Sequence, residues 1–283
     1  VDRHTSMIWR HNLAALPGNQ IRIHVDPTVP RRWRQHFRDG VEAWNAAFAP
    51  IGQPQAVRAV LPEDPDWPPD YDIGDARFST ISWSVSDYVS SVGIAKVDPR
   101  SGEILKSDIM MSDGWVQAWL ADLEIFRPNF TQSLGQAGGH HTELFLLRSH
   151  VVHEKAGGTG TEKEVKLSPS LAAARLRRRT SLLDVDNVEK PLDEAERERR
   201  KIIGQGLKQI VMHETGHILG LRHNFKGSLG VSYECTQDIN CSAVQGLSAS
   251  VMDYMPMNVP EIEGREVHAF SPILGGYDKL AIA

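Results

Sequence analysis

Two patterns of hydrophobic spacing follow one another near the start of the chain. In IRIHVDP (residues 21–27), Ile21, Ile23 and Val25 alternate with polar residues, which predicts a half-buried strand ended by proline. In residues 33–48, large apolar side chains recur every three or four positions, which places them on one face of a helix. Such a stripe could line a cofactor groove, but a face packed on the core is the favoured interpretation. The residues of this stripe are Trp33, Phe37, Val41, Trp44 and Phe48.

Further strands follow this helix. Residues 56–61 carry a weak strand pattern, a loop rich in proline and aspartate comes next, and residues 76–85 form a clearer strand. Two more strands, one beginning near Ser91 and one ending near Met111, are joined by a turn at residues 98–102. A strand, a helix and then several strands predict an α/β (α+β) fold with one mixed sheet.

The periodic pattern stops in the middle of the chain and returns near its end. Residues 130–192 are rich in Gly, Thr and charged residues, which indicates an insertion. A helix is then predicted from Asp193, which can cap it, to Leu219, and Gly220 ends it. Because glycine is a poor helix former, Gly204 and Gly206 predict two helical pieces rather than one.

Composition and charge exclude several classes of partner. The 283 residues are 41% hydrophobic and 24% charged, which is typical of a globular protein. A formal net charge of −5 gives no general attraction to nucleic acid, and no apolar run is long enough to span a membrane. The first residues lack the pattern of a signal peptide, so any export signal would lie outside this segment. The sequence does not specify the oligomeric state.

The two cysteines, Cys235 and Cys241, are six positions apart in a polar stretch. In an oxidising compartment they would close a small loop as a disulfide, and otherwise they would remain two thiols. The disulfide is favoured, because C-x5-C within a loop suits a bridge better than it suits a zinc finger.

The chemistry of the chain is concentrated in HETGHILGLRH, residues 213–223. On a helix, His213 and His217 lie one turn apart on the same face, so both can bind one metal ion. Glu214 can reach a water on that ion without being a ligand, and Gly220 lets the chain turn so that His223 becomes the third ligand. Three imidazoles with one open position predict one catalytic Zn2+.

Two alternatives compete with this zinc site. Two histidines four apart can simply be surface residues of a helix, but the longer pattern with Gly220 and His223 makes that explanation far weaker. A second group of histidines lies in the glycine-rich insertion without helical spacing, and ordinary exposed side chains are the favoured interpretation there. These are His140, His141, His150 and His153.

With this motif, and with the stretch SVMDY (residues 250–254), the chain resembles the metzincin clan of zinc endopeptidases. It is most similar to a family of large bacterial zinc-dependent metalloproteases whose catalytic part is called the Met-zincin domain. Asn224 is not the residue that marks the better-characterised metzincin families, so their substrate preferences are not carried over. The stretches that carry the narrower resemblance are VDPTVPRRWRQHFRDGVEAWNAAF, VDPRSGEIL, HETGHILGLRHNFKGS, SVMDYMP and LGGYDKLAIA.

The resemblance implies a zincin-like fold in a single catalytic domain, residues 1–283. A twisted mixed sheet, a backing helix and an active-site helix would form an N-terminal subdomain, residues 1–220, interrupted by the insertion. Residues 221–283 would form a smaller C-terminal subdomain with the Met-turn. Met252 would lie beneath the three imidazoles, and Tyr254 would bind the metal loosely or stabilise the oxyanion. The sheet's edge strand would bind an extended substrate through its backbone; its tentative residues are Val92, Gly93, Ile94 and Ala95.

The predicted function is a zinc-dependent endopeptidase acting on a peptide or protein substrate. Glu214 would take a proton from the zinc-bound water and later deliver it to the leaving amine. The alternatives are a zinc hydrolase of another specificity, either an exopeptidase or an enzyme that cleaves a non-peptide amide, and a zinc-containing binding module without turnover. The resemblance and the favoured disulfide also predict a secreted protein, exported to the periplasm or the cell exterior.

Overall fold

A computed structural model of the chain describes residues 7–86, 88–126, 194–262 and 264–283. Contacts between Cα atoms divide the chain into a main unit, Val1–Trp119 with Arg199–Ala283, and a second unit, Leu120–Glu198. The predicted insertion at 130–192 and its four histidines lie outside the described residues. The sheet and the candidate site both belong to the main unit. Among the described residues, no helix combines the length and the apolar character needed to cross a membrane.

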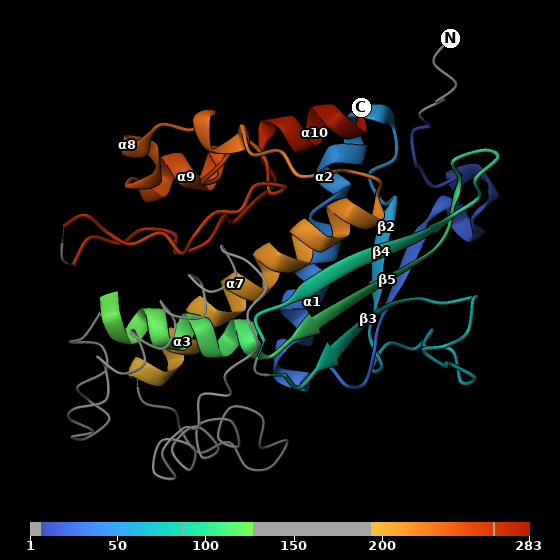
Figure 1. The fold of residues 1–283 in the computed structure, drawn as a ribbon, viewed down its shortest axis with the longest axis horizontal. Helices are drawn as coiled ribbons and strands as arrows, with labels where there is room; N and C mark the ends of the chain where they lie inside the picture. The colour runs from blue at the N-terminus through green and yellow to red at the C-terminus, as the bar shows by residue number, and fades with distance from the viewer. Residues whose placement is uncertain (1–6, 87, 127–193, 263) are drawn as a thin grey trace, which may run out of the picture. The chain divides into compact units, whose positions relative to one another are not determined.

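The main unit contains the mixed sheet that the sequence predicted. Its strands lie in the order β2-β1-β3-β5-β4, and all neighbours are parallel except β4 and β5 (Figure 1). The strand that begins at Ser91 therefore lies at the edge of the sheet, as predicted. The bounds are β1 Ile21–Val25, β2 Val57–Val60, β3 Ser79–Ser84, β4 Ser91–Val97 and β5 Ile104–Ser112.

The predicted backing helix is present in two pieces, α1 (Arg34–Glu42) and α2 (Asn45–Phe48), after a 3-10 turn η3 (Arg31–Trp33). All five apolar residues of the predicted stripe are buried. The helix is interrupted where side chains bind other segments. The indole of Trp44 donates to the carbonyl of Met212 at 2.9 Å, and the amide of Asn45 bonds both backbone groups of Val57.

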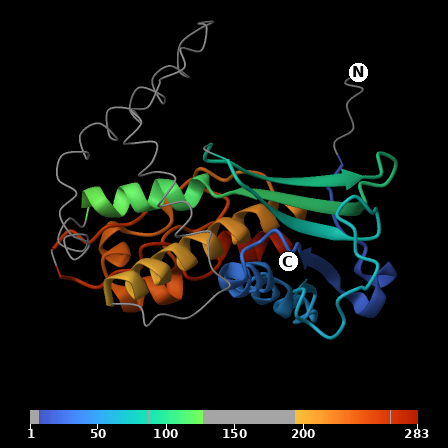
Figure 2. The same ribbon diagram turned by 90° about the horizontal axis from the view of Figure 1, so that it is seen from below.

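The zinc-motif helix α7 runs unbroken from Glu194 to Ile218, so the prediction of two helical pieces was wrong. The glycines serve close packing instead. A Cβ atom on Gly206 would lie 2.8 Å from the ring of Trp119, and a Cβ on Gly204 would collide with the ring of His36. Similarly, a Cβ on Gly40 of α1 would lie 2.7 Å from Val211. Helices α1 and α7 therefore pack closely together on the same side of the sheet (Figure 2).

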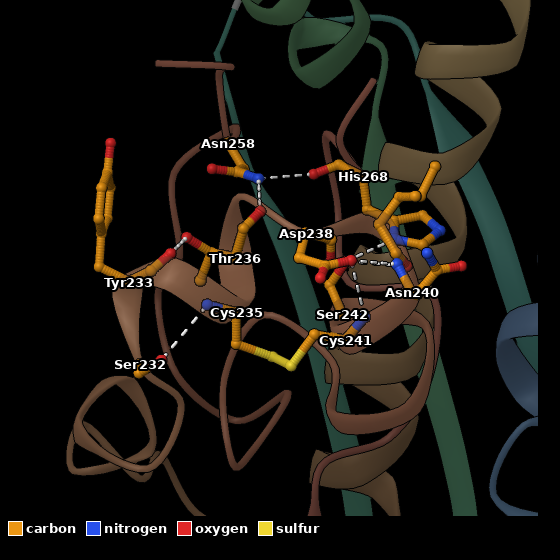
Figure 3. The surroundings of a disulfide bond; sticks show 11 residues. Ser232, Tyr233, Cys235, Thr236, Asp238, Asn240, Cys241, Ser242, Asn258 and His268 are labelled. Atoms are coloured by element: carbon orange, nitrogen blue, oxygen red, sulfur yellow. Dashed lines mark hydrogen bonds between the residues drawn. A yellow bond between two sulfur atoms is a disulfide. The ribbon is translucent and has the colours of Figure 1, made fainter. Parts of the chain in front are cut away.

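Beyond α7 the described chain contains short helices joined by loops. A disulfide between Cys235 and Cys241 links α8 to α9, which confirms the favoured prediction (Figure 3). Beside it, the amide of Asn258 donates to the carbonyls of Thr236 and His268 (Figure 3). These bonds tie the loop before α10 to α8. The predicted subdomain boundary at residue 220 stays a prediction. The remaining helical bounds are η1 Leu13–Ala15, η2 Pro17–Asn19, η4 Ala49–Ile51, α3 Gly114–Phe126, η6 Gly227–Leu229, α8 Tyr233–Thr236, α9 Ile239–Gln245 and α10 Gly276–Ile282.

Candidate metal centre

Helix α7 and the turn after it bring three histidines together. His213 and His217 lie one turn apart on α7, and Gly220, with φ of +98°, turns the chain back toward them. This backbone angle is strained for residues with a side chain, which explains the glycine. The Nε2 atoms of His217 and His223 lie 3.1 Å apart, and one nitrogen from each of the three rings falls within 4.8 Å of the others.

The remaining ring nitrogens of the two helical histidines are bound to backbone carbonyls. Nδ1 of His213 donates to the carbonyl of Val251 at 2.6 Å, and Nδ1 of His217 donates to that of Leu221 at 3.0 Å. A carbonyl can only accept, so Nδ1 carries the proton and the Nε2 lone pair is left for a metal. Burial lowers the pKa of His213 to about 4, which also keeps its ring neutral. The three residues could therefore hold a metal ion, and a three-imidazole set suits zinc.

Glu214 lies beside this group and is held by the edge strand. Its side chain is only 4% exposed, and the hydroxyl of Ser91 donates to Oε1 at 2.6 Å. Its other oxygen, Oε2, has no hydrogen-bond partner among the described residues. Burial raises the pKa of the Glu214 carboxyl. A buried carboxylate that is held in place beside the three histidines is suited to accept a proton.

Strand β4 approaches α7 very closely at this point. A Cβ on Gly93 would lie 2.7 Å from the backbone oxygen of Glu214 and 3.2 Å from Cβ of His217. Only glycine permits this approach. The family resemblance implied that Gly93 lies on the edge strand, but nothing in the sequence identified Ser91 as a partner of Glu214. The only signal for Ser91 was its position at the start of that strand.

The segment Ser250–Tyr254 lies against the same turn of α7. Met252 is fully buried, and its sulfur occupies the space that a side chain at Gly216 would need. The carbonyl of Met252 accepts from the backbone N–H of Asn224 at 3.0 Å, directly after His223. The structure thus brings Met252 to α7 between the two helical histidines. Its predicted role as a floor for the imidazoles remains a prediction.

A buried carboxylate from the last helix fixes this segment. Asp278 of α10 is completely buried, and it accepts from the Ser250 hydroxyl at 2.6 Å and from the N–H groups of Val251 and Gly275 at 2.8 and 2.9 Å. Because the Val251 carbonyl holds His213, Asp278 acts on the metal centre through one intervening residue. The sequence showed only that Asp278 lies in a stretch shared with the resembling family.

Tyr254 lies over the histidines but is 65% exposed. Its ring is stacked on that of His213 at 5.5 Å between centroids, and its hydroxyl lies 3.5 Å from Nδ1 of His223. The ring of Phe225 stacks on that of His223, with 5.4 Å between the ring centroids. The structure therefore brings Tyr254 to the site, together with Phe225, which the sequence did not identify.

A cavity of about 1430 Å³ surrounds these residues. Val92, Gly93 and Ala95 of β4 line it, whereas Ile94 does not. Three residues near the start of the chain, Met7, Ile8 and Trp9, also line it. The backbone of Trp9 is held against the turn at Gly220. This N-terminal wall could not be predicted from local sequence patterns, because it depends on contacts between distant segments.

The mixed sheet, the histidine-bearing helix and the three-histidine group are compatible with a zincin-like fold. Residues 195–283 match the model of a family described as Met-zincin. The matched residues include all three histidines, Glu214 and Met252. A search of curated proteins and a search of solved structures each found no significant match.

Proposed function

We propose that this chain is a zinc-dependent endopeptidase. The observation that supports it is the convergence of three histidine nitrogens within 4.8 Å, with the buried carboxylate of Glu214 in the same cavity. The family match over the same residues points to the same class of enzyme. Zinc held by His213, His217 and His223 would supply Lewis-acid chemistry and a nucleophile near neutral pH.

Glu214 acts as the general base and then as the general acid. Its Oε1 is held by the Ser91 hydroxyl, and its carboxylate is the group that receives the proton. Burial raises its pKa, which makes the protonated form accessible for delivery to the leaving amine. The hydroxyl of Tyr254 is close enough to the histidines to donate to the developing oxyanion.

The shape of the cavity favours an extended peptide. Its lining extends along α7 from Gly220, at the end beside Trp9, to Gln209 and Ile210 at the other end. The three histidines lie between these ends, so residues on both sides of a cleaved bond would have room. Edge strand β4 forms one wall and can add a peptide strand through its backbone groups. Cleavage within a chain, rather than at its end, fits a cleft that continues on both sides of the metal ligands.

The test combines metal analysis with cleavage of end-blocked, internally quenched peptides. The proposal expects about one zinc per chain, cleavage that chelation abolishes and zinc restores, and internal cut sites identified by mass spectrometry. Glu214→Ala should keep its zinc and lose cleavage, which separates loss of the base from loss of the metal. Cleavage that survives chelation, or a fully active Glu214→Ala, would refute the proposal.

We also propose that the protein is exported. The supporting observation is the disulfide between Cys235 and Cys241, because such bonds persist in oxidising compartments. Cell fractionation of the native host would test this. Recovery of the protein only from the cytoplasmic fraction would contradict it.

A further inference from the structure

The cavity has a distinct end on α7, on the side away from Trp9. Gln209 precedes His213 by one helical turn, and both side chains line the cavity. Aromatic rings surround this end. The rings of Trp119 and Phe270 meet at 4.9 Å, those of Trp115 and Trp119 at 5.6 Å, and all three residues line the cavity. This end is therefore a largely apolar pocket, one turn from the metal ligands.

Gln209 brings a polar group into that pocket in a fixed orientation. The residue is only 9% exposed, and its Oε1 accepts from the backbone N–H of Ser271 at 2.5 Å. Because an N–H group needs an acceptor, the oxygen must face Ser271, and the amide NH2 must face the other way. No acceptor within the described chain bonds this NH2 group, so it is left as a donor at the wall of the cavity.

A second donor lies at the same end. The indole nitrogen of Trp115 is buried and has no hydrogen-bond partner among the described residues. Unpaired buried N–H groups are costly, and folded proteins rarely leave them without a compensating partner. Two N–H donors beside aromatic rings would be satisfied by a ligand that places a carbonyl oxygen there.

We propose that Gln209, with Trp115, makes the enzyme select a side-chain amide, glutamine or asparagine, next to the cleaved bond. This inference rests on the proposed endopeptidase function. An amide carbonyl can accept from the Gln209 NH2, while the rest of the side chain packs on the rings. A leucine would leave the donors unpaired. A glutamate would bury a charge at an end of the cavity that no basic side chain lines among the described residues.

The test compares three end-blocked peptides that differ only at one position beside the scissile bond: glutamine, leucine and glutamate. Each of the two flanking positions is tested in turn. For the wild-type enzyme we expect kcat/KM about tenfold higher for glutamine at one of them. Gln209→Met keeps the length of the side chain but removes the donor. In this variant the ratio of kcat/KM for the glutamine peptide to kcat/KM for the leucine peptide should fall to near one.

Gln205→Met is the matched control. Gln205 lies one turn earlier on α7 and does not line the cavity, so this variant makes the same chemical change outside the pocket and should keep the tenfold ratio. If Gln209→Met unfolds through loss of the Ser271 bond, Trp115→Phe replaces it, since it removes one donor and keeps an aromatic ring. A ratio lowered at least twofold supports the proposal, and an unchanged ratio in the folded variant overturns it.

A binding measurement separates this inference from the proposed function. The same peptides, labelled with a fluorophore, are titrated against zinc-loaded Glu214→Ala and Glu214→Ala/Gln209→Met. Tighter binding of the glutamine peptide that depends on Gln209, without cleavage by the wild-type enzyme, would refute the protease and keep the pocket. Equal binding of all three peptides would overturn the pocket, whether or not the wild-type enzyme cleaves them.

Discussion

The two halves of the metal centre are built in different ways. His213, Glu214 and His217 come from regular positions on α7, and the first two are buried, with exposures of 6% and 4%. The other half comes from loops, and there His223 and Tyr254 are exposed. A helix positions its side chains by its own repeat, whereas the loop half depends on individual hydrogen bonds. Changes to the two halves should therefore have different consequences.

Removing the charge of the base on the helical half should have the largest effect. We expect Glu214→Gln to lower kcat/KM by about 10³-fold, because proton transfer is lost. Burial raises the pKa of Glu214, so the charged form is disfavoured in the fold, and the neutral amide should leave the melting temperature unchanged or higher. Peptide cleavage and thermal unfolding of the same preparation test both statements, and a clear loss of stability would contradict the second.

Asp278→Ala acts on the loop half and should affect both the fold and the metal. The change removes the oxygens that accept from the Ser250 hydroxyl and from the N–H groups of Val251 and Gly275, and it leaves these buried donors unpaired. We expect a loss of about 1–3 kcal/mol in the free energy of unfolding and a 10- to 100-fold weaker zinc affinity, because Val251 no longer holds His213 firmly. Denaturant unfolding and competition with a zinc chelator measure these effects. Unchanged zinc affinity would show that the contact does not reach the metal centre.

Acid should destabilise the metal-free protein through its buried histidines. Burial lowers the pKa of His213 to about 4 from 6.5 and also lowers the pKa values of His11, His24 and His36. The unfolded chain therefore binds protons below pH 6.5 that the folded chain binds only at lower pH. Stability should be complete above pH 6.5 and fall by about 2–3 kcal/mol as the pH approaches 4. Urea unfolding of the chelated protein at pH 7 and pH 5 tests this, and equal stabilities would contradict it.

Removing the disulfide changes the loop half but should leave zinc binding unaffected. Replacing Cys235 and Cys241 together by serine should lower the free energy of unfolding by about 2 kcal/mol, since the bridge closes a short loop. Neither cysteine lines the cavity, so zinc affinity should stay within about twofold of the wild-type value. The double variant is compared with Asp278→Ala in the same chelator assay. A large loss of zinc affinity would show that the loop half behaves as one unit.

Ser91→Ala should give the smallest effect. The hydroxyl orients one oxygen of Glu214, and its loss should lower kcat about threefold with KM unchanged. Ser91→Thr, which keeps a hydroxyl, should recover most of this loss. An increase in kcat for Ser91→Ala would mean instead that Ser91 restrains Glu214.

Repeating patterns made the regular parts of the molecule predictable. The alternation at Ile21, Ile23 and Val25 and the spacing of His213 and His217 each contain the geometry of the element that they form. The unbroken α7 was not predictable in this way, because packing against His36 and Trp119 outweighs the low helix propensity of glycine.

Contacts between distant segments could not be predicted either. Ser91 and Glu214 are separated by 123 positions, and nothing in the strand pattern around Ser91 indicates the pairing. The same holds for Asp278, because two of its three partners, Ser250 and Val251, lie 28 and 27 positions away in a loop. Hydrophobic periodicity specifies the face of an element, but it does not specify which polar side chains will meet across the fold.

The glycines of α7 also bear on how the protein folds. Gly204, Gly206 and Gly216 each cost about 1 kcal/mol of helix stability relative to alanine, so this segment has little helicity on its own. Its helix must form together with the side chains that fill the glycine positions, which are distant in the sequence. Such nonlocal contacts make folding slow, and the histidines acquire their spacing only after that assembly. Zinc would then bind late, and it would preserve the native state mainly by slowing unfolding.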